Sequence, residues 1–471
     1  MRRKVCIIPT VIPLARLIRR GARLALMSLT AALLLMQTGV YATPRTLVTG
    51  QECKRTAFNV VEDKVVRAMP PETQISGVLG GGPSKKSVDG KEDPFAKLTA
   101  SPRSSTMDDE FLDRLSADTW AYLSSQPATT NHLPWSWQSD VISGGDYANT
   151  TEIGLYALSW LAAYDLQRAW SPSWAETEAE VVAVLDQLLA WQTGSQSEQP
   201  HGPNAYQTSV FYQWYWISWT PPVVGADIDR NQLVPSVDNA WLAASLVTIR
   251  EYAEANDYGN LAQRADAILQ KMDFRLWYDD ATHLFYWGDI QNPRGGGVAD
   301  FYSTEGRIIN FVARALGQLS REEFLQSLES LEQSAGTYDA ITVEKVSWNG
   351  AYFLYASPAV FIQEMNTPYG ANTTMPATQA QIAYARNQGY DVWGLSDCYD
   401  VRDGGYVNQG APPVAMPDTP ETRPGLVAPH ATGLALNTHL ASEAIINLQT
   451  ISDTFPCAYN PVYGFYDSVM A

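Results

Sequence analysis

Residues 301–317 read Phe-Tyr-Ser-Thr-Glu-Gly-Arg-Ile-Ile-Asn-Phe-Val-Ala-Arg-Ala-Leu-Gly, and this stretch predicts a helix that is entered from a loop. Apolar side chains recur at helical spacing after Arg307, Ser303 or Thr304 can cap the start, and the final glycine offers a C-terminal stop. Glu305 would then lie in the first turn, where the helix dipole stabilises a carboxylate. A structural role and a chemical role are therefore both open for Glu305.

The same apolar spacing recurs along most of the chain after residue 107. Further helices are predicted at 111–123, 150–166, 174–191, 237–253, 261–272, 321–331 and 378–386, with a final pair within 428–451. Long loops rich in Gly, Pro, Trp and Tyr separate them, and a short strand pair is expected near 285–290. Strands do not alternate with helices as a parallel sheet would require. We therefore predict an all-α fold built from helical hairpins.

The N-terminal 42 residues are predicted to be a signal peptide rather than part of the fold. Basic residues, an apolar run over 24–36 and Val40-Tyr41-Ala42 fit a cleavable leader, with an uncleaved membrane anchor as the alternative. Residues 43–107 are weakly patterned and are interpreted as an arm or linker, which leaves 108–471 as the folded domain. This organisation predicts an exported, periplasmic or extracellular protein. No later apolar run is long enough to span a membrane.

Charge and cysteine content narrow the possible partners. The net charge of −18 becomes more negative without the basic leader, which argues against nucleic acid or anionic membranes as partners. After the leader, Cys53, Cys398 and Cys457 remain, an odd number without Cys-x-x-Cys spacing. We expect one disulfide and one free thiol, and neither a metal site nor a cofactor.

Five loop segments combine acidic or polar residues with aromatic residues and glycine. They contain Asp238, Glu305, Ser347–Phe353, Trp393–Asp400 and Val427–Gly433. Hydrolysis of a glycosidic bond needs two carboxyl groups, one protonated and one ionised. Many of the fifteen Trp residues also lie in loops, where flat rings can stack on sugars, whereas helix-borne Trp residues are better explained as core.

The order of these segments resembles the glucoamylase-like domain of β-1,2-glucan-active enzymes and cyclic β-1,2-glucan synthases. The matching motifs are Thr304-Glu-Gly-Arg307, Ser347-Trp-Asn-Gly350, Gln381-Ile-Ala-Tyr-Ala-Arg386, Trp393-Gly-Leu-Ser-Asp397, Val427-Ala-Pro-His430 and Tyr463-Gly-Phe-Tyr-Asp467. Upstream, Thr151-Glu-Ile-Gly-Leu-Tyr156 and Pro203-Asn-Ala-Tyr206 are also similar to an exported bacterial family of unknown function. The resemblance covers 108–471 and implies an (α/α)6 barrel with its cleft at the loop-rich end.

The resemblance also implies roles for individual residues. Glu305 matches a family acid and is expected to be the general acid, Asp397 the base or nucleophile, and Asp238 a further catalytic carboxyl. The substrate-binding residues expected around them are Arg307, Trp348, Asn349, Trp393, Tyr399, Asp400, His430 and Tyr206.

Two departures from the family pattern and several structural alternatives remain. Asp397 replaces a longer Glu, and Leu354 replaces an acid of the synthase motif. The chain also ends soon after Asp467, where related domains usually continue, so closure of the barrel is left open. Asp397 and Asp400 could belong to an Asp-rich turn, and His430 could cap a helix or sit in the core. Arg307 is expected to pair with Glu305 or another acid, which would lower that acid's pKa.

Two functions fit these observations. The favoured one is an exported glycoside hydrolase or transglycosidase that acts on a glucan or envelope polysaccharide. The alternative is a non-catalytic carbohydrate-binding or envelope-assembly protein that uses the same aromatic-lined cleft. Convergence of Glu305 and Asp397 on one cleft separates the two, because catalysis requires both carboxyls at one bond.

Overall fold

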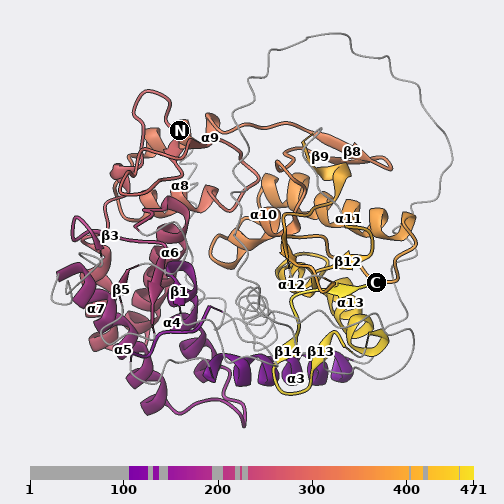
Figure 1. The fold of residues 1–471 in the computed structure, drawn as a ribbon, viewed down its shortest axis with the longest axis horizontal. Coiled ribbons are helices and arrows are strands. Elements are labelled where there is room, and N and C mark those ends of the chain that lie inside the picture. The colour runs from indigo at the N-terminus through magenta and orange to yellow at the C-terminus, as the bar shows by residue number, and fades with distance from the viewer. Residues whose placement is uncertain are drawn as a thin grey trace, which may run out of the picture.

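Helices follow one another around a ring in the computed structural model (Figure 1). The structure describes residues 105–125, 131–136, 147–193, 205–217, 223–224, 232–402, 405–416, 423–455 and 457–471. The predicted leader and the arm as far as residue 104 lie outside these ranges.

The α-helices agree closely with the apolar periodicity of the sequence. They are α3 (Ser105–Ser124), α4 (Thr150–Asp165), α5 (Trp174–Thr193), α6 (Ser236–Ala255), α7 (Gly259–Leu269), α8 (Arg307–Ala315), α9 (Arg321–Glu329), α10 (Tyr352–Ala356), α11 (Met375–Asn387), α12 (Pro429–Leu434) and α13 (Ala441–Thr454). Short 3-10 or π turns lie at 274–276, 357–360, 370–374, 412–414 and 435–437. The helix α10 was not predicted, because five residues are too few for apolar periodicity to show.

Successive helices pair as hairpins in two layers. The hairpins are α4–α5, α6–α7, α8–α9, α10–α11 and α12–α13. Within one layer α4 contacts α6, α6 contacts α8, and α10 contacts α12, whereas α5 contacts α7 in the other. Most residues of α4, α6, α8 and α12 are buried, so these helices form the inner layer. The predicted all-α fold of helical hairpins is confirmed.

Short strands decorate the helix connections. The largest sheet is antiparallel and contains β1 (Tyr147–Asn149), β4 (Trp214–Trp216) and β5 (Val223–Val224). The two-stranded pairs are β2 (Ala205–Tyr206) with β3 (Val210–Phe211), β6 (Phe285–Tyr286) with β7 (Val298–Ala299), β8 (Gly336–Tyr338) with β9 (Ile341–Val343), β10 (Cys398–Tyr399) with β11 (Tyr406–Val407), β12 (Leu426–Val427) with β15 (Val469–Met470), and β13 (Tyr459–Asn460) with β14 (Gly464–Phe465). β6 confirms the strand expected near residue 285.

The two ends of the described domain meet and close the ring. Helix α3 packs against α4, α13 and the β13–β14 hairpin (Figure 1). The hydroxyl of Tyr459 donates to Asp118 Oδ2 at 2.6 Å, and the rings of Tyr122 and Tyr463 meet edge to face. The closure that the sequence left open is therefore made by α3 and the C-terminal hairpin.

The start of α8 differs from the prediction. Gly306 is the N-cap, no side chain caps the helix, and Glu305 lies just before the first turn. The expected capping residues bond elsewhere, because Ser303 Oγ donates to the Lys345 carbonyl and Thr304 Oγ1 donates to Glu305 Oε2.

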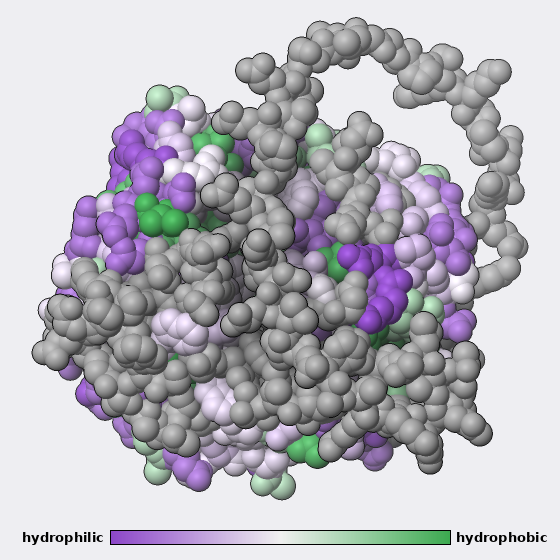
Figure 2. Space-filling view, viewed as in Figure 1, coloured by the Kyte–Doolittle hydropathy of each residue, from purple (hydrophilic) through white to green (hydrophobic). Residues whose placement is uncertain are grey.

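Hydrophilic residues dominate the described surface visible in Figure 2. The large hydrophobic residues that are exposed in the described ranges, Ile290, Leu325, Tyr406 and Val462, come from four separate segments. None of the described helices combines the length and hydropathy needed to cross a membrane. Cys398 is a buried free thiol and Cys457 is disulfide-bonded.

Candidate active site

Four half-buried carboxyl groups lie at the entrances of the inner helices and of β10. Glu152 is in the first turn of α4, Asp238 is in the first turn of α6, Glu305 precedes α8, and Asp397 precedes β10. Because each outer helix returns the chain, the inner helices run the same way and their N-termini gather at one end of the ring. Four acids distant in sequence thus meet at the loop-rich end.

The four carboxyls influence one another's ionisation in a row. Burial, followed by the charge of Asp238, raises the pKa of Glu152 to about 7. Burial also raises the pKa of Glu305, and Asp238 adds to that rise. The pKa of Asp397 is raised well above its usual value, first by burial and then by Glu305. Like charges raise a carboxyl pKa only at short range, so each acid in this row neighbours the next.

Glu305 has several groups that favour its ionised form. Its Oε2 accepts a hydrogen bond from the Thr304 hydroxyl at 2.9 Å. Its carboxylate precedes the N-terminus of α8, where the helix dipole is positive. Its backbone N–H and the nearby Arg307 charge also lower the pKa of Glu305, although burial outweighs them and the net shift is upward.

Among the described residues, the polar partner of Asp397 is the carboxamide of Asn349. The Asn349 Nδ2 donates to Asp397 Oδ1 at 3.1 Å, and the Asn349 Oδ1 accepts from the Ala351 N–H at 3.0 Å. The loop before α10 is also tied to the loop that carries Asp397, because the Tyr352 N–H donates to the Leu395 carbonyl. The Asn349 side chain is fully buried and bonded at both its oxygen and its nitrogen, so it is fixed in position. Its hydrogen bond therefore fixes the orientation of the Asp397 carboxyl.

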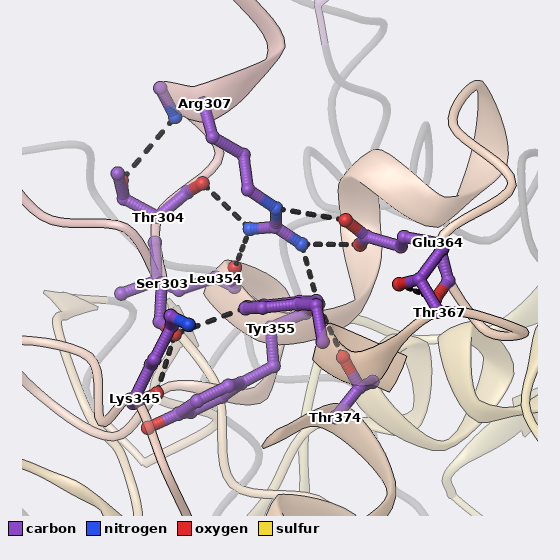
Figure 3. Close-up of polar contacts among 11 residues, drawn as sticks. Ser303, Thr304, Arg307, Lys345, Leu354, Tyr355, Glu364, Thr367 and Thr374 are labelled. Atoms are coloured by element: carbon purple, nitrogen blue, oxygen red, sulfur yellow. Dashed lines mark hydrogen bonds and ion pairs between the residues drawn. The ribbon is translucent and has the colours of Figure 1, made fainter. Parts of the chain in front are cut away.

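Arg307 was predicted to bind substrate, and that prediction is wrong. Its side chain is fully buried, and its five N–H donors reach Glu364 twice and the carbonyls of Thr304, Leu354 and Tyr355 (Figure 3). A guanidinium has five N–H donors, so none remains for a ligand. The expected pairing with an acid exists, but the acid is Glu364.

Asp400 and Trp393 were also predicted to bind substrate, and both are structural. Asp400 is fully buried and accepts bonds from Arg402 and Arg423. Burial alone would raise the pKa of Asp400, but these bonds hold it below its ordinary value. Trp393 is buried, its ring meets Tyr352 edge to face, and its carbonyl accepts from Thr432 and Asn447.

The predicted residue His430 and the C-terminal residues Asp467 and Ser468 lie against the loop that follows Asp397. His430 is buried in the first turn of α12, in agreement with the structural alternative, and its Nδ1 lies 3.7 Å from Asp467 Oδ1. The other oxygen of Asp467 accepts from the Tyr399 N–H at 2.5 Å, and Ser468 Oγ donates to the Tyr399 carbonyl. The C-terminal segment therefore holds the backbone two residues after Asp397.

The remaining predicted residues differ in their relation to the acids. Trp348 is half-buried beside Asn349, and the ring of Tyr399 is half-buried and meets Tyr406 edge to face. Tyr206 lies on β2, where its hydroxyl accepts from Gln207 and its ring packs against the main core. Tyr206 therefore belongs to a hairpin rather than to the carboxyl row.

Sequence reasoning gave one residue of this site no functional role and considered another only as one of the loop Trp residues. Glu152 was interpreted only as part of a helix start, and its carboxylate does close a capping box, accepting from the Asn149 N–H and the Ser136 hydroxyl. Trp287, one of the loop Trp residues whose flat rings could stack on sugars, is half-buried. Its carbonyl accepts from the Ser236 N–H at the start of α6, and its ring lies against Gly306, where a Cβ would be 3.2 Å from the indole. The Thr-Glu-Gly-Arg motif offered a signal for this aromatic contact, because Gly306 has no side chain and so leaves room for the Trp287 ring beside Glu305.

In the part of the chain that the structure describes, no group of three or more His, Cys, Asp and Glu side chains is arranged to hold a metal ion.

Comparison with solved structures identifies known proteins that share this fold. No protein-family model and no curated protein matches the sequence. Solved structures do match. The endo-β-1,2-glucanase of Chitinophaga pinensis, in complex with sophorotriose and glucose, has a TM-score of 0.59 and 14% identity, and the match covers 77% of this chain and 86% of that one. The β-1,2-glucanase of Parabacteroides distasonis has a TM-score of 0.59 and 17% identity, over 78% and 54% of the two chains.

A fungal enzyme shows the same likeness. A mutant of the Talaromyces funiculosus endo-β-1,2-glucanase, in complex with β-1,2-glucan, has a TM-score of 0.57 and 15% identity, over 80% of this chain and 82% of that one. At such identities the likeness concerns the fold. The chain has the glucoamylase-like (α/α)6-barrel fold, as the resemblance implied.

Proposed function

We propose that this protein is a glycoside hydrolase or transglycosidase that cleaves a glucan between Glu305 and Asp397. The observation that carries the proposal is the proximity of these two half-buried carboxyls, which come from loops 92 residues apart, so that the charge of Glu305 raises the pKa of Asp397. Two such groups at one bond are the minimum that glycosidic hydrolysis requires. The barrel fold, shared with glycoside hydrolases, supports the same conclusion.

The roles of the two carboxyls follow from how many hydrogen-bond donors and positive charges stabilise the ionised form of each. Glu305 has the Thr304 hydroxyl, a helix N-terminus and a nearby guanidinium to stabilise its charge, whereas Asp397 has the amide of Asn349 as its donor among the described residues. We therefore assign the shared proton to Asp397 as general acid and ionised Glu305 as base or nucleophile. The sequence led to the opposite assignment, because it does not reveal how many donors surround each carboxyl.

The substrate proposed is a neutral glucan, with β-1,2-glucan as the first candidate. Four of the similar structures are described as β-1,2-glucanases, including complexes with sophorotriose or β-1,2-glucan, and three others as putative glucoamylases. The acidic protein and its carboxyl row would repel an anionic polysaccharide. With its basic and apolar leader, the protein is proposed to act outside the cytoplasm.

Incubation with a panel of β-1,2-, β-1,3-, β-1,4- and α-1,4-glucans tests this function. Wild-type protein should release oligosaccharides from at least one glucan, and Glu305→Gln and Asp397→Asn should each lower kcat by roughly 10²- to 10⁴-fold. Binding without release by the wild type would support the non-catalytic alternative. Release that survives either substitution unchanged would remove that residue from the mechanism.

A second experiment tests the assignment of roles. An aryl glycoside with an activated leaving group needs little protonation, so Asp397→Asn should retain far more activity on it than on glucan. Glu305→Ala should instead respond to added azide, which can replace a missing nucleophile or water-activating group. If the two variants exchange these behaviours, Glu305 is the acid.

A further inference from the structure

We propose that the outward face of the β1–β4 sheet, formed by Tyr147, Trp214 and Trp216, is a distal sugar-binding platform for the same glucan chain. This inference rests on the proposed function and extends it from the cleaved bond to the length of chain that the protein grips. Trp214 and Trp216 are among the loop Trp residues for which the sequence allowed sugar stacking, but none of the three was predicted as a site residue.

The pairing register separates the two faces of this sheet. Tyr147 lies opposite Trp216, and Asn149 lies opposite Trp214. Directly opposed residues of antiparallel strands share a face, so these four side chains share one. The other face carries Ala148 and Tyr215, which are both fully buried.

The inward face is anchored in the core, so the outward face is held rigidly. The Tyr215 ring stacks on Trp191 at a centroid distance of 3.8 Å and an interplanar angle of 10°. On the outward face, Tyr147, Trp214 and Trp216 are half-buried, and Tyr147 meets Trp214 edge to face at 5.2 Å and Trp216 at 6.5 Å. Three flat rings are thus fixed in place without being enclosed in the core.

The platform is continuous with the carboxyl row. Asn149, on the outward face, is the N-cap of α4, and its side chain bonds Asp238. The Thr151 hydroxyl donates to Asp238 Oδ1 at 3.1 Å. β1 therefore leads directly from the aromatic face to the second acid of the row, and it lies beside the start of α4 in Figure 1.

A second connection runs from β4 to Trp287 through backbone hydrogen bonds. The Gln213 N–H donates to the Leu233 carbonyl, the Val234 N–H to the Asp289 carbonyl, and the Ser236 N–H to the Trp287 carbonyl. Trp287 in turn lies against Gly306, the neighbour of Glu305. The strand that carries Trp214 and Trp216 is therefore connected by backbone hydrogen bonds to the segment of Trp287, whose ring packs against the residue after Glu305.

The chemistry of this face fits a neutral sugar chain. Aromatic faces stack on the C–H faces of pyranose rings, and the three rings of this face carry no charge. The platform joins the carboxyl row at Asn149 and Asp238, so it would bind sugar residues of the chain other than the two at the cleaved bond. Such binding raises affinity for long chains and leaves short substrates unaffected.

Binding to the inactive Glu305→Gln protein tests the platform. Dissociation constants for β-1,2-glucan chains of increasing length are compared among that background, Trp214→Ala, Trp216→Ala and the double variant. The double variant should bind long chains about ten-fold more weakly and bind a disaccharide equally well. Trp174→Ala is the matched control: Trp174 is also half-buried but begins α5, at the end of the barrel where α4 finishes, and should change neither constant.

Two further variants guard against a folding artefact. Trp214→Tyr and Trp216→Tyr retain a flat ring and should keep long-chain binding, whereas general damage to the sheet would weaken binding at every length. Equal affinity of the background and the double alanine variant for long chains, or a loss that does not depend on chain length, would overturn the platform while leaving the proposed function intact. If wild-type protein neither binds nor cleaves any glucan, the proposed function itself fails.

Discussion

Glu305 and Arg307 stand two residues apart, yet the structure places them in contrasting surroundings. Arg307 is fully buried and each of its N–H donors has an acceptor. Glu305 is half-buried, lies in a row of acids and has a raised pKa. A buried charge that is completely paired is costly to disrupt, whereas a carboxyl kept near other carboxyls is destabilised by their charge. The pattern of partners therefore distinguishes the residue that builds the site from the residue proposed to act there.

The loop after α11 repeats this contrast. Asp400 is paired with two arginines and its pKa is lowered, whereas Asp397 is bonded by the Asn349 amide and its pKa is raised well above its usual value. In both segments, a carboxyl with a raised pKa is followed within three residues by a charged residue that is fully paired. Arg307 follows Glu305, and Asp400 follows Asp397. The ion pairs fix the loops that carry Glu305 and Asp397.

The largest effect on stability is expected for Arg307→Met. This change leaves Glu364 buried without its cation, which should lower the free energy of unfolding by about 3–5 kcal/mol. Urea denaturation followed by tryptophan fluorescence measures it. The double variant Arg307→Met/Glu364→Leu should recover part of the loss, and a single variant as stable as wild type would contradict the anchoring role.

Asn349→Ala should act on chemistry more than on stability. Loss of the amide frees Asp397 and should lower kcat/KM by roughly 10²-fold, because the carboxyl is no longer held in position. It also removes the bond to the ionised form, so the pKa of Asp397 should rise further. The alkaline limb of the pH–rate profile should therefore move to higher pH, and an unmoved limb would argue against Asp397 as the acid.

Asp400→Asn is the matched control for Asp397→Asn. It removes one charge three residues away and leaves Arg402 and Arg423, both partly exposed, to be solvated by water. The expected loss is about 1 kcal/mol in the free energy of unfolding, with the shape of the pH–rate profile unchanged. A shifted profile would show that the two aspartates titrate together.

The smallest effect is expected for Glu152→Gln and appears as a pH dependence. The folded pKa of Glu152, about 7, exceeds the ordinary value of 4.5, so the folded state binds the extra proton between these values. This group's contribution to stability is thus present at low pH and is lost as pH rises towards 7. Gln can keep the capping box, so thermal unfolding of the variant should depend less on pH than that of wild type between pH 5 and 7.5. Parallel curves would place the Glu152 pKa near its ordinary value.

The sequence predicted the helices well, because their apolar spacing is local information. It also selected Glu305 and Asp397, since an acid among glycine and aromatic residues at a helix entrance is visible in the motif. It could not assign Arg307 correctly, because Glu364 lies 57 residues downstream and the other acceptors are backbone carbonyls. Asp400 was misjudged for the same reason, since Arg423 comes from a separate loop. A charged residue in a motif reveals its role only when its partners are known.

The most direct test of this account measures activity and stability together for Glu305→Gln. Activity on β-1,2-glucan, or on whichever glucan the wild type cleaves, should fall by at least about 10²-fold. The Tm should stay level or rise, because one of the mutually repelling carboxyls has been neutralised. Unchanged activity, or a fall in Tm large enough to explain the loss of activity, would show that Glu305 serves the fold as Arg307 does and would contradict the account.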